Sequence, residues 1–208
     1  MKVVVFGASG RVGSRVVAQL LAAGHEVTAV VHSRNPFTDQ PKLRVESLDV
    51  HDGAKATEVI SGSQAVLSCL SSWQSESKDV LTTAMKSLVP AMHNARVSRI
   101  VSLTGNAAFT PDDNPSFIQK ANRAAMMKVA PKVLADGEQH MAVLRESGLD
   151  WTVLRSPVMN SLGKDAYRLS EKLSGATATI NRQAVARALV DQLTDTKWIG
   201  KAPTIWRA

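Results

Sequence analysis

The sequence is poor in cysteine and in aromatic residues, and it has no long apolar run. The single cysteine, Cys69, cannot form an internal disulfide, which is typical of a protein of the reducing cytoplasm. No apolar stretch is long enough to cross a bilayer, and no small-residue cleavage site follows the apolar N-terminal residues. We therefore expect a cytoplasmic protein with no membrane span and no signal peptide, in which Cys69 is a buried small hydrophobe.

Clusters of like charge and of metal ligands are also missing. The 25 Lys and Arg residues exceed the 18 Asp and Glu residues by seven, but the positive residues are scattered, and aromatic residues make up only 4% of the chain. We therefore expect no nucleic-acid partner, because such proteins concentrate their basic residues. An anionic small ligand explains the sign of the net charge equally well. The histidines stand apart and no second cysteine exists, so we expect no metal site.

What the sequence does contain is an alternation of short apolar runs with segments of helical period. The apolar runs, typical of buried strands, are Lys2–Phe6, Glu26–Val31, Leu43–Leu48, Ala65–Leu70, Arg99–Leu103 and Trp151–Leu154. The helical segments are Val12–Ala23, Ala54–Ile60, Asp79–Ala95, Phe117–Glu146 with a kink or break at Pro131, and Arg182–Leu193. This order predicts an α/β fold of one domain, residues 1–208, in which helices cover both faces of a doubly wound parallel sheet.

The first strand runs directly into a turn with three glycines, in the stretch VVVFGASGRVGSRVV. Gly7 permits a tight turn, Gly10 lets backbone amides approach a ligand, and Gly13 allows the following helix to pack closely on the sheet. The free N–H groups and the positive end of that helix favour a diphosphate. Because the motif follows a strand and opens a helix, it predicts a dinucleotide site rather than a structural turn.

The end of the second predicted strand indicates which dinucleotide is bound. Enzymes that prefer NAD usually place an Asp or Glu there, against the ribose 2′-hydroxyl. This chain has His32, Ser33 and Arg34 instead, and a guanidinium can grip the 2′-phosphate of NADP with paired hydrogen bonds. Arg11 could add a second positive charge from the glycine turn. We therefore expect NADP(H) rather than NAD(H), with a solvated Arg34 as the alternative.

Four stretches resemble the atypical short-chain dehydrogenase/reductase family, in the branch of the NmrA-like proteins and the biliverdin reductase B/flavin reductases. They are VVVFGASGRVG, VHSRNP, LDVHD and LRESGLDWTVLRSP, and the resemblance covers nearly the whole chain. It implies a three-layer Rossmann-type fold with a small C-terminal lobe, residues 156–208, on the substrate side.

The resemblance also implies roles for individual residues. Asp49 and Val50 would line the adenine pocket, although Asp49 could simply serve a turn, and Ser71 and Ser72 could simply cap a helix. Thr104 would lie near the reacting ring as a weak catalytic candidate. The complete set of expected cofactor residues is Gly7, Ser9, Gly10, Arg11, Val12, Gly13, His32, Ser33, Arg34, Asp49, Val50, Leu70, Ser71, Ser72, Ser102, Thr104, Arg155, Pro157 and Val158.

One feature of the wider superfamily is absent, namely the tyrosine and lysine, four residues apart, that supply a proton. The single tyrosine, Tyr167, follows the sixth predicted strand, and the residue four positions later is Glu171. Ordinary alcohol–ketone chemistry is therefore disfavoured. Lys132, Asp136 and His140 share one helix face, for which we expect a solvated or salt-bridged surface rather than a proton donor.

These observations leave two functions open. The first is an NADPH-dependent reductase that passes a hydride to a planar conjugated acceptor, such as a flavin or quinone-like compound, which tolerates the missing dyad. The acceptor would lie between two long segments, Asn106–Pro115 and Ser156–Thr179, with Trp73 either walling the cleft or, as we favour, buried in the core. The second is a non-catalytic, NmrA-type redox sensor that acts through a protein partner. A homodimer is also left open.

Overall fold

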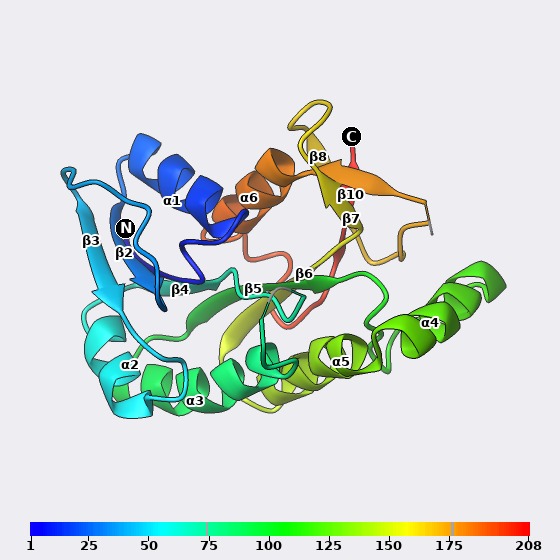
Figure 1. Ribbon diagram of the computed structural model, residues 1–208, viewed down its shortest axis with the longest axis horizontal. Helices are drawn as coiled ribbons and strands as arrows, with labels where there is room; N and C mark the ends of the chain where they lie inside the picture. Colours follow the sequence, from blue (N-terminus) through cyan, green and yellow to red (C-terminus); the bar gives the residue numbers. More distant parts are fainter. Residues whose placement is uncertain (74, 176) are drawn as a thin grey trace.

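An eight-stranded sheet lies at the centre of the computed structural model, which describes residues 1–73, 75–175 and 177–208 (Figure 1). Eight strands form this sheet, and β7 and β9 form a second, two-stranded sheet. The strands of both sheets are β1 (Lys2–Phe6), β2 (Glu26–Val31), β3 (Leu43–Ser47), β4 (Ala65–Ser68), β5 (Arg99–Gly105), β6 (Asp150–Ser156), β7 (Val158–Asn160), β8 (Tyr167–Ser170), β9 (Thr179–Asn181) and β10 (Thr204–Arg207). The helices are α1 (Gly13–Ala22), α2 (Gly53–Ile60), α3 (Val80–Ala95), α4 (Phe117–Val129), α5 (Pro131–Arg145) and α6 (Arg182–Asp191).

The strand order is β3-β2-β1-β4-β5-β6-β10-β8, and all neighbours are parallel except β10 and β8. The chain therefore winds outward from β1 in one direction and from β4 in the other. In such sheets the crevice outside the carboxyl ends of these two strands binds ligands. The predicted α/β fold is confirmed, and the glycine turn lies at this crevice.

Alternating side chains of β1 divide the core into two layers, because successive residues of a strand point to opposite faces. Val3 and Val5 pack in the layer that α1 and α6 cover, whereas Val4 and Phe6 pack in the layer that contains α2, α3 and α5. Figure 1 shows α1 and α6 side by side on one face, with α2, α3 and α5 along the other. Both faces of the sheet are therefore covered, as predicted.

The break predicted at Pro131 is confirmed. The long helical segment is two helices, and Pro131 begins the second of them at a position that needs no N–H donor, because the chain leaves the helical conformation at Ala130. The C-terminal part of the chain differs from the sequence prediction. The segment Ser156–Thr179, expected to be irregular, contains β7 and β8, and β10 was not expected at all. Among the described residues, no helix has both the length and the apolar character needed to span a bilayer.

Candidate functional site

In the glycine turn after β1, a side chain would not fit at Gly7 or at Gly13. Gly7 has a φ of +71°, and a Cβ on it would lie 2.9 Å from the backbone of Cys69 and Leu70 at the end of β4. A Cβ on Gly13 would lie only 2.1 Å from the carbonyl oxygen of Gly7. The first and third glycines are therefore needed for a positive φ and for close packing of α1 on the sheet. The geometry agrees with the roles predicted for them.

The turn also leaves backbone donors free at the start of α1. The Gly10 amide donates to the Gly7 carbonyl at 3.0 Å, and the Ser14 amide donates to Gly10 at 2.9 Å. Within the described chain, the amides of Arg11, Val12 and Gly13 have no such acceptor. The first turn of α1 contains no acidic residue that could occupy the positive end of the helix. A diphosphate fits this cradle by charge and by its need for donors.

The residues after β2 lie at the neighbouring strand end. His32, Ser33 and Arg34 are all exposed, and Arg34 forms no ion pair with any described residue. Asp49, after β3, lies 4.0 Å from both His32 and His51. Its Oδ1 also accepts the His51 amide at 3.0 Å, so Asp49 serves a turn, as the alternative interpretation allowed. This side of the crevice carries positive and imidazole groups around one carboxylate.

Beyond β4 the chain crosses to the other half of the crevice. Cys69 is buried, as predicted, and burial raises the pKa of its thiol to about 12. Leu70 is half-buried and Ser71 is exposed. Trp73 was expected to be buried, but its exposed fraction is 57%, so that prediction is wrong. Its ring lies in the loop ahead of α3, outside both core layers.

Asp136 of α5 does not lie on a solvated face, contrary to prediction. Its carboxylate is buried and accepts the amides of Leu81 and Thr82, at 3.0 and 2.8 Å, in the first turn of α3. Ser72 donates its hydroxyl to the same carboxylate. One side chain of α5 thus caps α3, although Asp136 is more than fifty residues from Leu81 and Thr82 in the sequence.

His140 lies one turn further along α5 and is also buried, so the expectation of a solvated face is wrong here too. Its Nδ1 lies 3.0 Å from the Gly137 carbonyl, and its Nε2 lies 3.0 Å from the Ser102 hydroxyl of β5. Burial lowers the pKa of His140 to about 4. The ring is neutral at physiological pH, with Nδ1–H donating to the carbonyl and Nε2 accepting from Ser102. It ties α5 to the sheet and is not a proton donor.

Thr104 lies two residues beyond Ser102 on β5, and it packs against α5. A Cβ on Gly137 would lie 2.6 Å from the Thr104 hydroxyl oxygen and 3.1 Å from the Ala108 side chain. The missing side chain of Gly137 therefore lets the helix approach the end of β5 closely. The Thr104 side chain is almost wholly buried, at 8% exposure of the residue.

The end of β6 carries three expected cofactor residues in different surroundings. Val158 is exposed and Pro157 is buried. The guanidinium of Arg155 is held by Asp113, with distances of 2.5 and 2.9 Å, and by the Ala202 carbonyl at 2.7 Å. Only 3% of the Arg155 side chain and 6% of the Asp113 side chain are exposed. Asp113 was not predicted, because nothing in the local pattern TPDDNP distinguishes it from Asp112.

Two further arginines lie near the glycine turn and were not expected. Arg15 of α1 donates to the Arg11 carbonyl, and Arg182 is the first residue of α6. The sequence carried no distinguishing signal for them, because none of the six described helices has an acidic residue in its first turn. The expected residues therefore gather at the carboxyl ends of β1 to β6, with these arginines beside them. Their roles toward a cofactor stay predictions.

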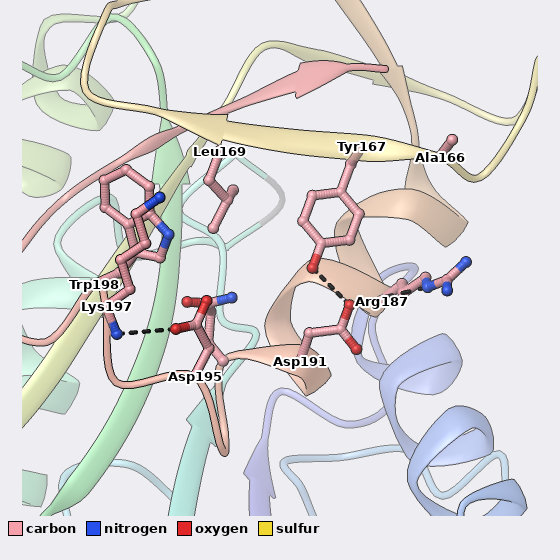
Figure 2. A pocket seen from close by; sticks show the side chains of 9 residues that line it. Ala166, Tyr167, Leu169, Arg187, Asp191, Asp195, Lys197 and Trp198 are labelled. Atoms are coloured by element: carbon pink, nitrogen blue, oxygen red, sulfur yellow. Dashed lines mark hydrogen bonds and ion pairs between the residues drawn. The ribbon is translucent and has the colours of Figure 1, made fainter.

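An open cavity of about 450 Å³ lies elsewhere, between β8, the end of α6 and the loop after it (Figure 2). None of the expected cofactor residues lines it. Tyr167 points into this cavity and donates its hydroxyl to Asp191 at 2.6 Å. Burial, together with this hydrogen bond, raises the pKa of Tyr167 well above its usual range. Tyr167 therefore cannot replace the missing proton donor at the crevice.

Comparison with known proteins gives the same assignment. The sequence profile described as NAD(P)H-binding matches residues 7–196. An uncharacterised chloroplastic protein of Arabidopsis thaliana is 27% identical over 169 residues, which span 74% of this chain but only 58% of that protein.

Solved structures share the fold over almost the entire chain. An oxidoreductase of Lactococcus lactis superposes with a TM-score of 0.82 at 16% identity, over 100% of this chain and 91% of the other. A short-chain dehydrogenase/reductase of Veillonella parvula in complex with NADP has a TM-score of 0.79 at 18% identity, over 99% and 94%. A Streptococcus pneumoniae protein called an NADH-flavin reductase has a TM-score of 0.75 at 20% identity, with 100% of both chains covered. The chain belongs to the NAD(P)H-binding family and has a Rossmann-type fold.

Proposed function

We propose that the protein is an NADPH-dependent reductase that passes a hydride to a planar conjugated acceptor, such as a flavin or a quinone-like compound. One observation carries the cofactor preference. The strand end beside the glycine turn has Arg34 and no carboxylate, while the turn itself leaves three amides without partners among the described residues. A carboxylate there would repel a 2′-phosphate, whereas a guanidinium binds it.

The choice of acceptor follows from the proton donors near the strand ends. His140 is neutral and buried, and the Tyr167 hydroxyl is held by Asp191. A substrate whose alkoxide must be protonated by the protein would find no group of suitable pKa among these. A flavin or quinone delocalises the charge of the incoming hydride and can take its proton from water. The remaining work of the protein is to hold two rings in contact.

The residues that would do this work lie on both sides of the crevice. We infer that Arg34 and the turn hold NADPH, which supplies the hydride when bound, and that Thr104 guides the reacting ring. We place the acceptor wall in the lobe of residues 156–208, opposite the loop 106–115. The protein called an NADH-flavin reductase and the one solved with NADP support this direction. We also propose a cytoplasmic location, with which the single, buried cysteine agrees.

The experiment compares the two coenzymes in one variant. Arg34→Ala should weaken NADPH about ten- to a hundredfold, because a hydrogen bond to a charged group contributes about 1.5–3 kcal/mol. Binding of NADH, which has no 2′-phosphate, should stay unchanged and serves as the internal control. Fluorescence titration of both nucleotides measures this. An equal loss for the two would contradict the assignment of Arg34.

A redox sensor is the second candidate, and the missing proton donors favour it equally. Wild-type protein mixed with NADPH and a panel of flavins and quinones separates the two functions. Consumption of NADPH well above the protein-free rate supports the reductase. Tight NADPH binding without turnover across the panel would refute the reductase and leave the sensor.

A further inference from the structure

Helix α4 has the opposite arrangement to an ordinary surface helix. Such a helix buries its apolar side and turns its polar side to water. The side of α4 that faces the protein is mostly polar: Gln119 donates to the Leu173 carbonyl at 2.8 Å, and Arg123 pairs with Glu138 at 2.8 Å. Met126 packs against one core layer, but none of the thirteen residues of α4 is buried. Most of the apolar residues of α4 therefore face away from the core.

These apolar residues form a row on the outer side of α4. Phe117, Ala121, Ala125 and Val129 follow one another at intervals of four residues, which places them along one side of the helix. All four are exposed, as is Ile118 next to Phe117, and the exposed fraction reaches 85% for Phe117 and 78% for Val129. We call these five residues the α4 stripe. A single exposed apolar residue needs no explanation, but a contiguous row of them marks an interaction surface.

The unpaired charges around the α4 stripe are positive. Lys120 and Lys128 are exposed on α4, which contains no Asp or Glu, and Lys132 is exposed at the start of α5. Among the residues that the structure describes, none of these three lysines forms an ion pair. The carboxylates of the loop before α4 and of α5 are paired or buried, namely Asp112, Asp113, Asp136 and Glu138. The surface that carries the stripe therefore attracts anions.

A cavity of about 400 Å³ lies beside α4 and has the same combination of apolar and basic groups. It is lined by Phe109, Pro111 and Pro115 of the preceding loop, and by Lys120, Arg123 and Glu138. The Arg123 guanidinium lies 5.6 Å from the centre of the Phe109 ring. Three apolar side chains thus lie next to an ammonium group that no described carboxylate neutralises. Such a cavity fits a molecule with an apolar chain and an anionic head.

We propose that α4 docks on an anionic lipid surface, with the α4 stripe among the upper parts of the acyl chains and the lysines against the headgroups. Figure 1 shows α4 at one end of the molecule, farther from the central sheet than the other helices, where a flat surface can reach it. A lysine keeps its ammonium at the headgroups while its stem lies along apolar surface. The neighbouring cavity accepts one acyl chain. This is peripheral binding, since a helix of thirteen residues is too short to span a bilayer.

A second copy of the chain fits the α4 stripe less well. A helix of thirteen residues is about 20 Å long, so two stripes in contact would cover far less than the roughly 800 Å² per partner of a stable interface. This pairing would also bring Lys120 and Lys128 near the same residues of the other copy, and like charges repel. An anionic lipid surface instead satisfies the apolar side chains and the lysines together.

The test is cosedimentation of the whole protein with vesicles of phosphatidylcholine, either alone or mixed with phosphatidylglycerol. The wild type should bind the mixed vesicles about tenfold or more tightly than the neutral ones, and salt should weaken this binding. Replacing Phe117 and Ile118 together by Gln should weaken binding about tenfold or more, because two apolar side chains no longer leave water. Replacing Lys120 and Lys128 together by Gln should have an effect of similar size.

Matched controls change residues of the same kinds away from α4. Leu162 lies in the loop between β7 and β8 with an exposed fraction of 73%, and Lys55 and Lys86 are exposed on α2 and α3. Leu162→Gln, and Lys55→Gln combined with Lys86→Gln, should bind the mixed vesicles as the wild type does. Circular dichroism should give the same melting temperature for all variants, because every changed side chain is exposed.

Three outcomes would overturn the proposal. The first is a wild type that does not bind the mixed vesicles. The second is a loss of binding in the controls as large as the loss in the α4 variants, because the contact would then not be at α4. The third is a dimer in sedimentation velocity that the double change at Phe117 and Ile118 abolishes, because a second copy would then cover the stripe. The vesicle assay needs no coenzyme, so its result is independent of the proposed reductase function.

Discussion

The buried ion pair between Arg155 and Asp113 makes a sharp prediction about stability. Asp113→Ala removes the only carboxylate that faces this guanidinium in the described structure, and leaves the charge on a side chain that is 3% exposed. Removing one partner of a buried pair typically costs about 3–5 kcal/mol of unfolding free energy. Arg155 would keep the Ala202 and Ala108 carbonyls, so we expect about 3 kcal/mol. That is a large share of the roughly 5–15 kcal/mol of a typical protein.

The adjacent residue provides the control. Asp112 pairs with Arg145 at 2.8 Å, but its side chain is 80% exposed, so Asp112→Ala should cost under about 1 kcal/mol. Equilibrium urea unfolding, followed by circular dichroism, measures both variants. Adding Arg155→Met to Asp113→Ala should restore part of the loss, because the unpaired charge disappears. Equal costs for Asp112→Ala and Asp113→Ala would refute the argument that burial makes this pair important.

Two further predictions concern the turn and the buried histidine. Gly13→Ala would place a methyl group 2.1 Å from the Gly7 carbonyl oxygen, so α1 must move. We expect urea unfolding to show an unfolding free energy lower by about 1–3 kcal/mol, and calorimetry to detect no NADPH binding. A wild-type affinity in this variant would contradict the close packing. The pKa of His140 is about 4 when folded and 6.5 when unfolded, so the unfolded chain binds more protons between these values. Stability is therefore full above about pH 6.5 and falls toward pH 4 by about 1.4 kcal/mol per pH unit. Urea unfolding between pH 4 and 8 measures how the unfolding free energy depends on pH. In His140→Gln this dependence should be weaker by the contribution of one proton, and an unchanged dependence would refute the assignment.

The glycine turn could be predicted because the strand–turn–helix pattern around it is contiguous in the sequence. The contact that excludes a side chain at Gly7, with Cys69 and Leu70, is distant in the sequence and is known only from the folded chain. The six short apolar runs predicted β1 to β6, because a continuous apolar run marks a strand of a parallel sheet. Strand β8 was missed because it is a short, partly polar strand at the sheet edge, and β10, which lies between β6 and β8, because only two of its four residues are buried.

The surroundings of α5 could not be predicted for a different reason. Helical spacing placed Asp136 and His140 one turn apart, but spacing does not say whether a face meets water or protein: both are buried, whereas Lys132 at the start of α5 is exposed, as predicted. Asp136 is buried because two amides at the start of α3 donate to its carboxylate, and His140 is buried because Ser102 and the Gly137 carbonyl satisfy its ring nitrogens. Similarly, Arg155 and Asp113 are forty-two residues apart, and only the folded chain shows that they pair.

The cap that Asp136 supplies to α3 has a consequence for attempts to redesign this protein. Asp136 and His140 stand four residues apart on the helix before β6, which is the spacing of the tyrosine–lysine dyad in the superfamily that the sequence resembles. Exchanging them for such a dyad would strip α3 of its carboxylate and detach the imidazole from Ser102. Converting this scaffold into a conventional alcohol dehydrogenase is therefore not a two-residue graft, since the helix start and the sheet contact would first have to be rebuilt with other side chains.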